Sequence, residues 1–289
     1  MPDETKDSSR ICDVCGASAT YFITEMESGK PRKKRFCGQH IPKLETEFTK
    51  SLLKTVAFAT HSAKADITSD LKPKGSAPPI SLAVLISGGG TTLQNLIDQI
   101  AGGTLDAKIA VVVASKPGIA GIERAGKANI PCHIVERSKF ADVAAFSEAA
   151  FAHCEKAGAE LVCLAGWLPL VKIPTAFVGK VMNIHPSLLP SFGGRGMYGR
   201  RVHEAVLEHG CKISGCTVHF VDDAYDAGPI ILQRAVRVRE DDTPDTLAAR
   251  VFEQEQLAYP IAIELFRLGR LRIEERRVRR SAESKPGQQ

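Results

Sequence analysis

The chain has no apolar run long enough to span a membrane, which argues against an integral membrane protein. Its first residues, Met1 to Asp7, are mostly polar or charged, and no hydrophobic segment follows them. We therefore expect no secretory signal, no membrane partner and a cytoplasmic location. The composition is also not extreme: 289 residues, 44% hydrophobic and 25% charged, are typical of a globular chain with one large domain and a small one.

The chain also lacks the cysteine pattern of a small disulfide-bonded protein. Five of its eight cysteines lie in apolar segments typical of buried thiols: Cys132, Cys154, Cys163, Cys211 and Cys216. The other three, Cys12, Cys15 and Cys37, form with His40 a Cys-x-x-Cys and a Cys-x-x-His pair. Thiolate and imidazole at this spacing predict a structural Zn²⁺ site. Four protein ligands leave no open position, so we expect no catalysis there.

The residues around this motif predict a small N-terminal domain. Residues 19–25 and 33–36 flank a Ser-Gly-Lys turn and indicate a hairpin. A domain of about 40 residues is too small to stay folded without a bound metal or an equivalent cross-link. The alternative to a metal site is that these three cysteines and His40 are unrelated residues in a flexible arm. The pattern resembles the zinc-ribbon-like domains at the start of McsA-type bacterial proteins, and such a domain could bind a protein partner. We assign residues 1–60 to this module with an amphipathic helix after His40, and residues 61–79 to a linker.

From Ile80 onward, apolar strand candidates alternate with helical stretches. The strand candidates are Leu82–Ser87, Ile109–Ala114, Cys132–Val135, Leu161–Ala165 and Val181–His185, and Ala141 to Ala157 is the longest helical stretch between them. This alternation predicts an α/β fold with a Rossmann-like, mostly parallel sheet. Gly215–Val221 and Ile230–Val238 lie too close together for a helical crossover and predict an antiparallel pair. We place this domain at residues 80–275.

Two polar motifs follow predicted strands. Asn183 and His185 end the strand candidate at 181–185 with their side chains on one face, and Asp226 lies in an Asp-Ala-Gly-Pro turn further on. Parallel sheets bind ligands at the carboxyl ends of their strands. Ser87-Gly88-Gly89-Gly90-Thr91-Thr92 joins the first strand to a helix, and such a turn can bind a phosphate through backbone amides and the helix dipole. Many glycine-rich turns of this kind bind no ligand and serve only to make a tight chain reversal.

Together these motifs resemble the glycinamide ribonucleotide formyltransferases. The resemblance covers about residues 81 to 275 and includes the glycine-rich turn, Leu164-Ala165-Gly166, the run Asn183 to Pro190, Ser214 to Val221, and Asp226 to Gln233. It implies that the chain is an enzyme of purine biosynthesis that transfers a formyl group from 10-formyltetrahydrofolate to the amine of glycinamide ribonucleotide, a small substrate with a phosphate group.

The resemblance also implies roles for individual residues. The implied catalytic residues are Asn183, His185 and Asp226; the substrate-binding residues are Gly90, Thr91, Thr92, His203 and Glu255; and the folate-binding residues are Leu168, Pro169, Leu170, Val171, Asn183, Asp222 and Asp226. The chain departs from the family at Gly89, Thr91 and Thr92 in the turn, at Pro169, and at Val143, where the family has an arginine for the folate tail. Taken alone, Glu255 could be a solvated helix carboxylate, and we interpret His219 as a hydrogen-bonded structural residue.

The implied reaction passes through a tetrahedral intermediate whose oxygen gains negative charge. Asn183 could donate a hydrogen bond to this oxygen, and protonated His185 could donate to it or to the leaving nitrogen. We expect Asp226 to raise the charged fraction of His185 and to order a water that carries the amine proton.

Several alternatives stay open. The enzyme could formylate another amine, such as an amino sugar nucleotide, or hydrolyse the folate to release formate, although hydrolases of this type usually carry a regulatory N-terminal domain. The alternative to an enzyme is a binding protein, an adaptor directed to its partner by the zinc module. The arginines near the C-terminus could attract RNA, but we favour a solvated, disordered tail at residues 276–289 over nucleic-acid binding.

Overall fold

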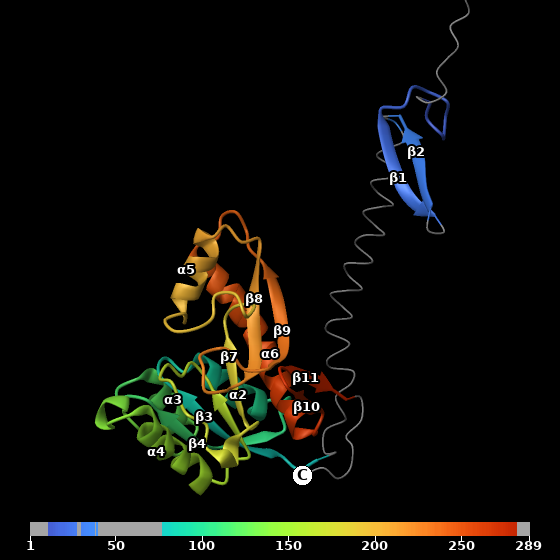
Figure 1. Ribbon diagram of the computed structural model, residues 1–289. Coiled ribbons are helices and arrows are strands. Elements are labelled where there is room, and N and C mark those ends of the chain that lie inside the picture. Colours follow the sequence, from blue (N-terminus) through green and yellow to red (C-terminus); the bar gives the residue numbers. More distant parts are fainter. Residues whose placement is uncertain (1–10, 28–29, 38, 40–76, 282–289) are drawn as a thin grey trace, which may run out of the picture. The chain divides into compact units, whose positions relative to one another are not determined.

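The computed structural model describes residues 11–27, 30–37, 39 and 77–281 (Figure 1). The chain divides into two compact units, Met1–Asp70 and Leu71–Gln289. No helix in the described ranges is long and apolar enough to cross a membrane.

The described part of the first unit is a β-hairpin. Strand β1 (Tyr21–Glu27) pairs antiparallel with β2 (Lys30–Phe36), with Tyr21 opposite Phe36 and Glu27 opposite Lys30. The predicted hairpin is therefore present, and it is slightly longer than expected. His40, the predicted helix after it and residues 61–76 of the predicted linker lie outside the described residues.

The second unit contains a nine-stranded sheet in the order β10-β11-β9-β8-β7-β6-β3-β4-β5. Its strands are β3 (Ile80–Ile86), β4 (Ala107–Ala114), β5 (Cys132–Ile134), β6 (Leu161–Leu164), β7 (Val181–His185), β8 (Ile213–Phe220), β9 (Ile230–Arg237), β10 (Leu271–Glu274) and β11 (Arg277–Arg280). Strands β3 to β7 are parallel to one another, whereas β8 is antiparallel to both β7 and β9. The predicted α/β fold with a mostly parallel sheet, and the predicted antiparallel pair, are confirmed.

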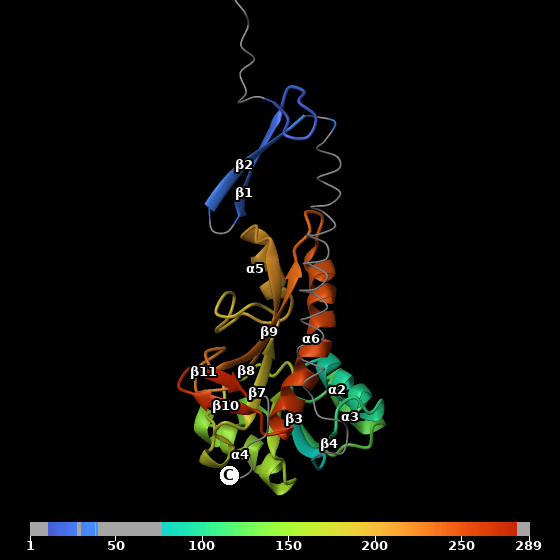
Figure 2. The same cartoon turned by 90° about the vertical axis from the view of Figure 1, so that its right-hand side faces the viewer.

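Helices cover both faces of this sheet (Figure 2). They are α2 (Thr91–Ala101), α3 (Ala120–Lys127), α4 (Val143–Lys156), α5 (Arg200–Glu208) and α6 (Pro244–Arg267). Strand β3 is buried along its whole length: Leu82, Val84 and Ile86 pack into a core with α2 and α6, while Ala83 and Leu85 pack into a second core with α4. Such a strand reads as a continuous apolar run because both of its faces are covered.

The connections create a crevice beside β3. The chain runs from β3 outward to β4 and β5, and then returns through α4 to β6 on the other side of β3. Ligands bind at the carboxyl ends of strands where the strand order reverses in this way. The long helix α6 supports this edge, because the buried hydroxyl of Tyr259 bonds to the carbonyls of Leu164 in β6 and Met182 in β7 at 3.1 and 2.9 Å.

The prediction of a disordered tail from residue 276 is wrong for its first part. Strand β11 pairs antiparallel with β10, and Arg277 pairs with Ile230 of β9. The reason is that Leu271 and Val278 pack against the core, while the arginines between them are exposed. The high density of charge concealed this short alternating pattern. Residues 282–289 lie outside the described residues.

Candidate active site

The end of β7 and the loop after β8 bring together the three predicted catalytic side chains. Asn183 Nδ2 donates to Asp226 Oδ1 at 3.4 Å, and His185 Nδ1 lies 3.4 Å from the same oxygen. Because Asn183 and His185 are two residues apart in a strand, their side chains project from one face, as the sequence predicted. The amide, imidazole and carboxylate therefore form one cluster.

The backbone around Asp226 fixes this carboxylate in place. Asp226 has a φ of 52°, in the left-handed region, and the N–H of Gly194 donates to its Oδ2 at 2.9 Å. A Cβ on Gly228 would lie 1.9 Å from the carbonyl oxygen of Phe220, so only glycine fits there. Burial favours a raised pKa for Asp226, but the polar groups around it, which are His219, His185 and the donating N–H of Gly194, outweigh burial and lower the pKa below its ordinary value. Asp226 is an anion at neutral pH.

Asp226 acts on His185 in the expected direction, because it raises the pKa of the imidazole, but burial has the larger effect. His185 is 4% exposed, and burial lowers its pKa more than Asp226 and the Phe192 carbonyl raise it. Its Nε2–H donates to the carbonyl of Phe192 at 2.8 Å, which leaves the unprotonated Nδ1 facing Asp226. The resting imidazole is neutral and can accept a proton at Nδ1.

A cavity of about 690 Å³ opens beside this cluster. Ser87, Gly88, Thr91 and Thr92 of the glycine-rich turn line one part of it, and Asn183, His185 and Asp226 line another. Gly90 does not line the cavity; it is the N-cap of α2 with a φ of 71°, and a Cβ there would lie 2.7 Å from the Cα of Gly121. The helix start has no side-chain cap and no acidic residue in its first turn, so its amides and dipole favour an anion.

A second cavity of about 50 Å³ shares Asn183 and Asp226 with the first. Most of the predicted folate-binding residues line it: Pro169, Leu170, Val171 and Asp222. Leu168 lines the large cavity instead, and its N–H donates to the hydroxyl of Ser87 at 2.9 Å. The predicted folate loop and the glycine-rich turn are thus joined by a direct hydrogen bond.

The two remaining predicted substrate-binding residues, His203 and Glu255, both line the large cavity. His203 is 4% exposed, and its Nδ1 has no hydrogen-bond partner among the described residues. Burial, and then the neighbouring His185, lower its pKa, so it is neutral. Burial raises the pKa of Glu255 from 4.5 to about 7, so this carboxyl group is only partly ionised at neutral pH. A titratable group with a shifted pKa in a cavity is typical of functional sites.

The sequence interpretation missed part of the cavity wall. The loop after the His-Pro-Ser motif adds Arg195, Met197 and Tyr198, and Ser87 bonds both Leu168 and Ser115. The four glycines at 193, 194, 196 and 199 could have indicated this loop from the sequence, because glycines allow a backbone to pass close to a binding site. As expected, His219 is hydrogen-bonded: its Nδ1–H donates to the Phe220 carbonyl at 2.8 Å, and its Nε2 accepts from Asn183 at 3.1 Å.

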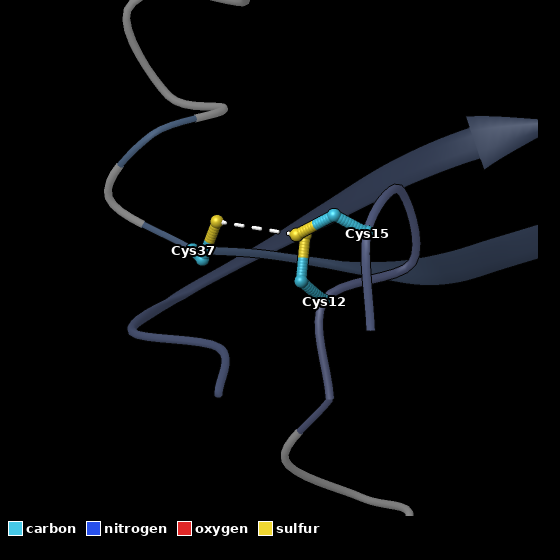
Figure 3. Close-up of side chains that lie close together, drawn as sticks. All are labelled: Cys12, Cys15 and Cys37. Atoms are coloured by element: carbon cyan, nitrogen blue, oxygen red, sulfur yellow. Dashed lines mark hydrogen bonds between the residues drawn. The ribbon is translucent and has the colours of Figure 1, made fainter. Parts of the chain in front are cut away.

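Three of the four predicted metal ligands meet in the N-terminal unit. The sulfur atoms of Cys12, Cys15 and Cys37 lie within 4.8 Å of one another, and Cys15 and Cys37 are 3.6 Å apart (Figure 3). Burial favours a raised pKa for Cys12, but hydrogen bonds from the backbone amides around Val14, Cys15 and Cys37 lower it to about 6. Three thiol groups turned toward one point fit a soft metal ion.

Comparison with known proteins identifies relatives of the second unit. The model of a family described as formyl transferase matches residues 80–263. Phosphoribosylglycinamide formyltransferase of Haemophilus influenzae is 38% identical over 196 residues, which are 67% of this chain and 90% of that protein. The trifunctional purine biosynthetic protein adenosine-3 of Gallus gallus is 39% identical over 211 residues. The match spans 72% of this chain but only about a fifth of that longer protein.

Solved structures agree with these matches. Glycinamide ribonucleotide transformylase 1 from Symbiobacterium toebii is 44% identical, with a TM-score of 0.66 and coverage of 70% of this chain and 94% of that one. A formyltetrahydrofolate deformylase from Pseudomonas syringae has a TM-score of 0.62 at 23% identity, which shows a shared fold alone.

Proposed function

Because this chain belongs to the formyl transferase family, we propose that it transfers a formyl group from 10-formyltetrahydrofolate to the amine of glycinamide ribonucleotide in purine biosynthesis. The comparisons confirm the enzyme class predicted from the sequence. The observation that carries the proposal is the cluster of Asn183, His185 and Asp226, which lies where the two cavities meet. Asn183 and Asp226 line both cavities, so an amine in the large cavity and a formyl group from the small one could meet beside them.

The linings of the two cavities offer different groups to the two reactants. The start of α2, with Thr91 and Thr92, suits the phosphate of glycinamide ribonucleotide, because free amides and the helix dipole favour an anion. Glu255 and His203 offer hydrogen-bonding groups to the polar part of the same substrate. The apolar wall formed by Leu170 and Val171 suits a flat pterin ring, whose polar edge can use backbone groups of the two loops.

Because His185 is neutral and Asp226 is an anion, both can accept a proton during the reaction. This favours a role in proton transfer over stabilisation of the oxyanion by a positively charged imidazole. The amine attacks the formyl carbon and forms a C–N bond, which gives an ammonium group and an oxyanion. The ammonium proton passes to Asp226 or to Nδ1 of His185, and from there to N10 of the folate. The bond between the formyl carbon and N10 then breaks, so that the formylated amine and tetrahydrofolate leave with no net gain or loss of protons.

Asn183 supplies the hydrogen bond to the oxyanion. Its Nδ2 donates to His219 at 3.1 Å and to Asp226 at 3.4 Å. The longer of these bonds is the one to exchange for the developing oxyanion, while the bond to His219 keeps the amide oriented. Removal of an oxyanion donor of this kind commonly lowers turnover by about 10²- to 10³-fold.

The direct test incubates the purified full-length chain with 10-formyltetrahydrofolate and glycinamide ribonucleotide, and follows tetrahydrofolate products by absorbance. Turnover that depends on the acceptor and is lost in Asn183→Ala supports the proposal. Turnover without acceptor would instead favour the hydrolase, and turnover only with an amino sugar nucleotide would favour a different acceptor.

We also propose that the N-terminal unit holds a structural Zn²⁺ through Cys12, Cys15, Cys37 and His40, as in the McsA-type domains that it resembles. The three convergent sulfur atoms support this proposal. The ion would stabilise a hairpin too small to have a core of its own. Close to one zinc per chain, reduced in Cys12→Ser and His40→Ala but not in Cys132→Ser, is the expected result of metal analysis; a chain purified without metal would rule it out.

A protein partner for this module and a cytoplasmic location also remain proposals. The domain limits that we propose are 1–60 for the zinc module, 61–79 for the linker and 80–275 for the catalytic domain, with the family match at residues 80–263 as support for the last.

A further inference from the structure

The glycine-rich turn contributes no positive charge to the large cavity. Its lining residues are Ser87, Gly88, Thr91 and Thr92, which offer amides and hydroxyls only. A phosphate dianion bound there would meet the partial charge of a helix start, equivalent to about half an elementary charge. A cation from another segment would complete such a site.

Among the described residues that line the cavity, two carry a permanent positive charge, Arg195 and Arg200. The guanidinium of Arg200 is already paired with Glu204 at 2.8 Å and with Asp245. Arg195 makes no hydrogen bond or ion pair with any residue that the structure describes. We propose that Arg195 binds the phosphate group of the substrate, an inference that rests on the proposed function.

The loop geometry presents Arg195 to the cavity in a defined position. The N–H of Met197 donates to the carbonyl of Gly194 at 3.1 Å, which closes a turn with Arg195 and Gly196 at its tip. Gly196 has a φ of 89°, as the third residue of a type II turn requires. The first residue of the turn is fixed, because the Gly194 N–H donates to Asp226 at 2.9 Å.

The glycines around this turn have different environments. A Cβ on Gly193 would lie 2.5 Å from Leu189 and 3.2 Å from the Cβ of Asp226, so the base of the loop packs tightly on the catalytic carboxylate. Cβ atoms on Gly194 and Gly196 would meet nothing within 4 Å. The base of the loop is therefore anchored, and its tip has open space around it.

The placement favours the substrate phosphate over the folate carboxylates. Arg195 shares the large cavity with the start of α2, whereas Pro169, Leu170 and Val171 of the folate loop line the small cavity. A planar guanidinium can bind two phosphate oxygens at once, which adds directional hydrogen bonds to its charge.

The test compares Arg195→Gln and Arg195→Lys with the wild-type enzyme, using Arg201→Gln as a matched control. Arg201 lies in the adjoining helix, and its guanidinium lies 5.1 Å from the ring centre of Tyr198. It does not line the cavity. For Arg195→Gln we expect KM for glycinamide ribonucleotide to rise roughly ten- to a hundredfold, with kcat and KM for the folate within about threefold of wild type. Arg195→Lys should recover part of the loss, because it keeps the charge but not the planar fork.

Calorimetry with ribose 5-phosphate tests Arg195 without any turnover. Weaker binding by Arg195→Gln than by Arg201→Gln would support the inference, even if glycinamide ribonucleotide proved not to be the acceptor. Equal binding of ribose 5-phosphate by the wild type and Arg195→Gln, or a rise in KM confined to the folate, would overturn it. A wild-type enzyme that turns over no glycinamide ribonucleotide would count against the proposed function alone.

Discussion

The carboxyl group of Glu255 in the wall of the large cavity should make the protein less stable at alkaline pH. Burial raises its pKa from 4.5 to about 7, a difference of about 2.5 units. Each unit corresponds to 1.36 kcal/mol, so the ionised carboxylate destabilises the folded state by about 3 kcal/mol above pH 7. Glu255→Gln keeps the size of the side chain and removes the charge. Comparing the stability of the wild type with that of Glu255→Gln therefore isolates the destabilisation caused by the ionised carboxylate.

The sign of the effect follows from proton binding. As the pH rises past 4.5, the unfolded chain releases the Glu255 proton while the folded chain keeps it until about pH 7. The folded state binds more protons over this interval, so the free energy of unfolding falls as the pH rises. Glu255→Gln should match the wild type below pH 4.5 and be more stable by up to about 3 kcal/mol at pH 8, or roughly 6–12 °C in Tm.

Thermal denaturation of the full-length chain at pH 5, 6, 7 and 8 measures this difference. Glu253→Gln is the control, because Glu253 lies on the same helix with an exposed side chain. The gain for Glu255→Gln should grow with pH, while Glu253→Gln should differ little from wild type at every pH. A gain independent of pH, or no gain at pH 8, would refute the reasoning. If Glu255 also binds substrate, the stabilised variant should have a higher KM for glycinamide ribonucleotide.

Three further substitutions test the site and its support. Asp226→Asn removes the charge that handles the amine proton, so kcat should fall about 10²- to 10⁴-fold with little change in KM; steady-state kinetics within threefold of wild type would contradict the assigned role. Gly228→Ala places a Cβ 1.9 Å from the Phe220 carbonyl oxygen, so we expect lost turnover and a lower Tm, in contrast to Gly126→Ala, where nothing lies within 4 Å. Tyr259→Phe removes the donor to two strand-end carbonyls, and urea denaturation should show a loss of about 1–3 kcal/mol; an unchanged midpoint would show that the bond contributes little.

Local patterns in the sequence were enough to place the main elements of the catalytic unit. The strand Val181–His185 was predicted with its observed limits, because its apolar residues lie between a glycine turn and a proline. The alternation of strands with helical stretches indicated the mostly parallel sheet. Since the side chains of a strand alternate between its faces, Asn183 and His185 also had to project together.

The electrostatic state of the site depended on tertiary contacts. The sequence suggested that Asp226 would raise the charged fraction of His185, and Asp226 does raise the pKa of this imidazole, but the structure encloses His185 so fully that burial lowers its pKa overall. The cost of removing a charged group from water depends on every segment packed around it, and these segments lie far apart along the chain. The raised pKa of Glu255 has the same origin.

Packing also determined the conformation of segments whose sequence gives only a weak indication of secondary structure. The arginine-rich C-terminus forms β10 and β11 because Leu271 and Val278 reach the core, although the charge around them suggested disorder. Arg195 faces the cavity because the loop that carries it is bonded to Asp226, 31 residues further along the chain. The sequence by itself determined which chemical groups are present and which strands carry them. Only the folded chain decided which groups meet and which are charged, because contact and desolvation arise between residues that are distant in sequence.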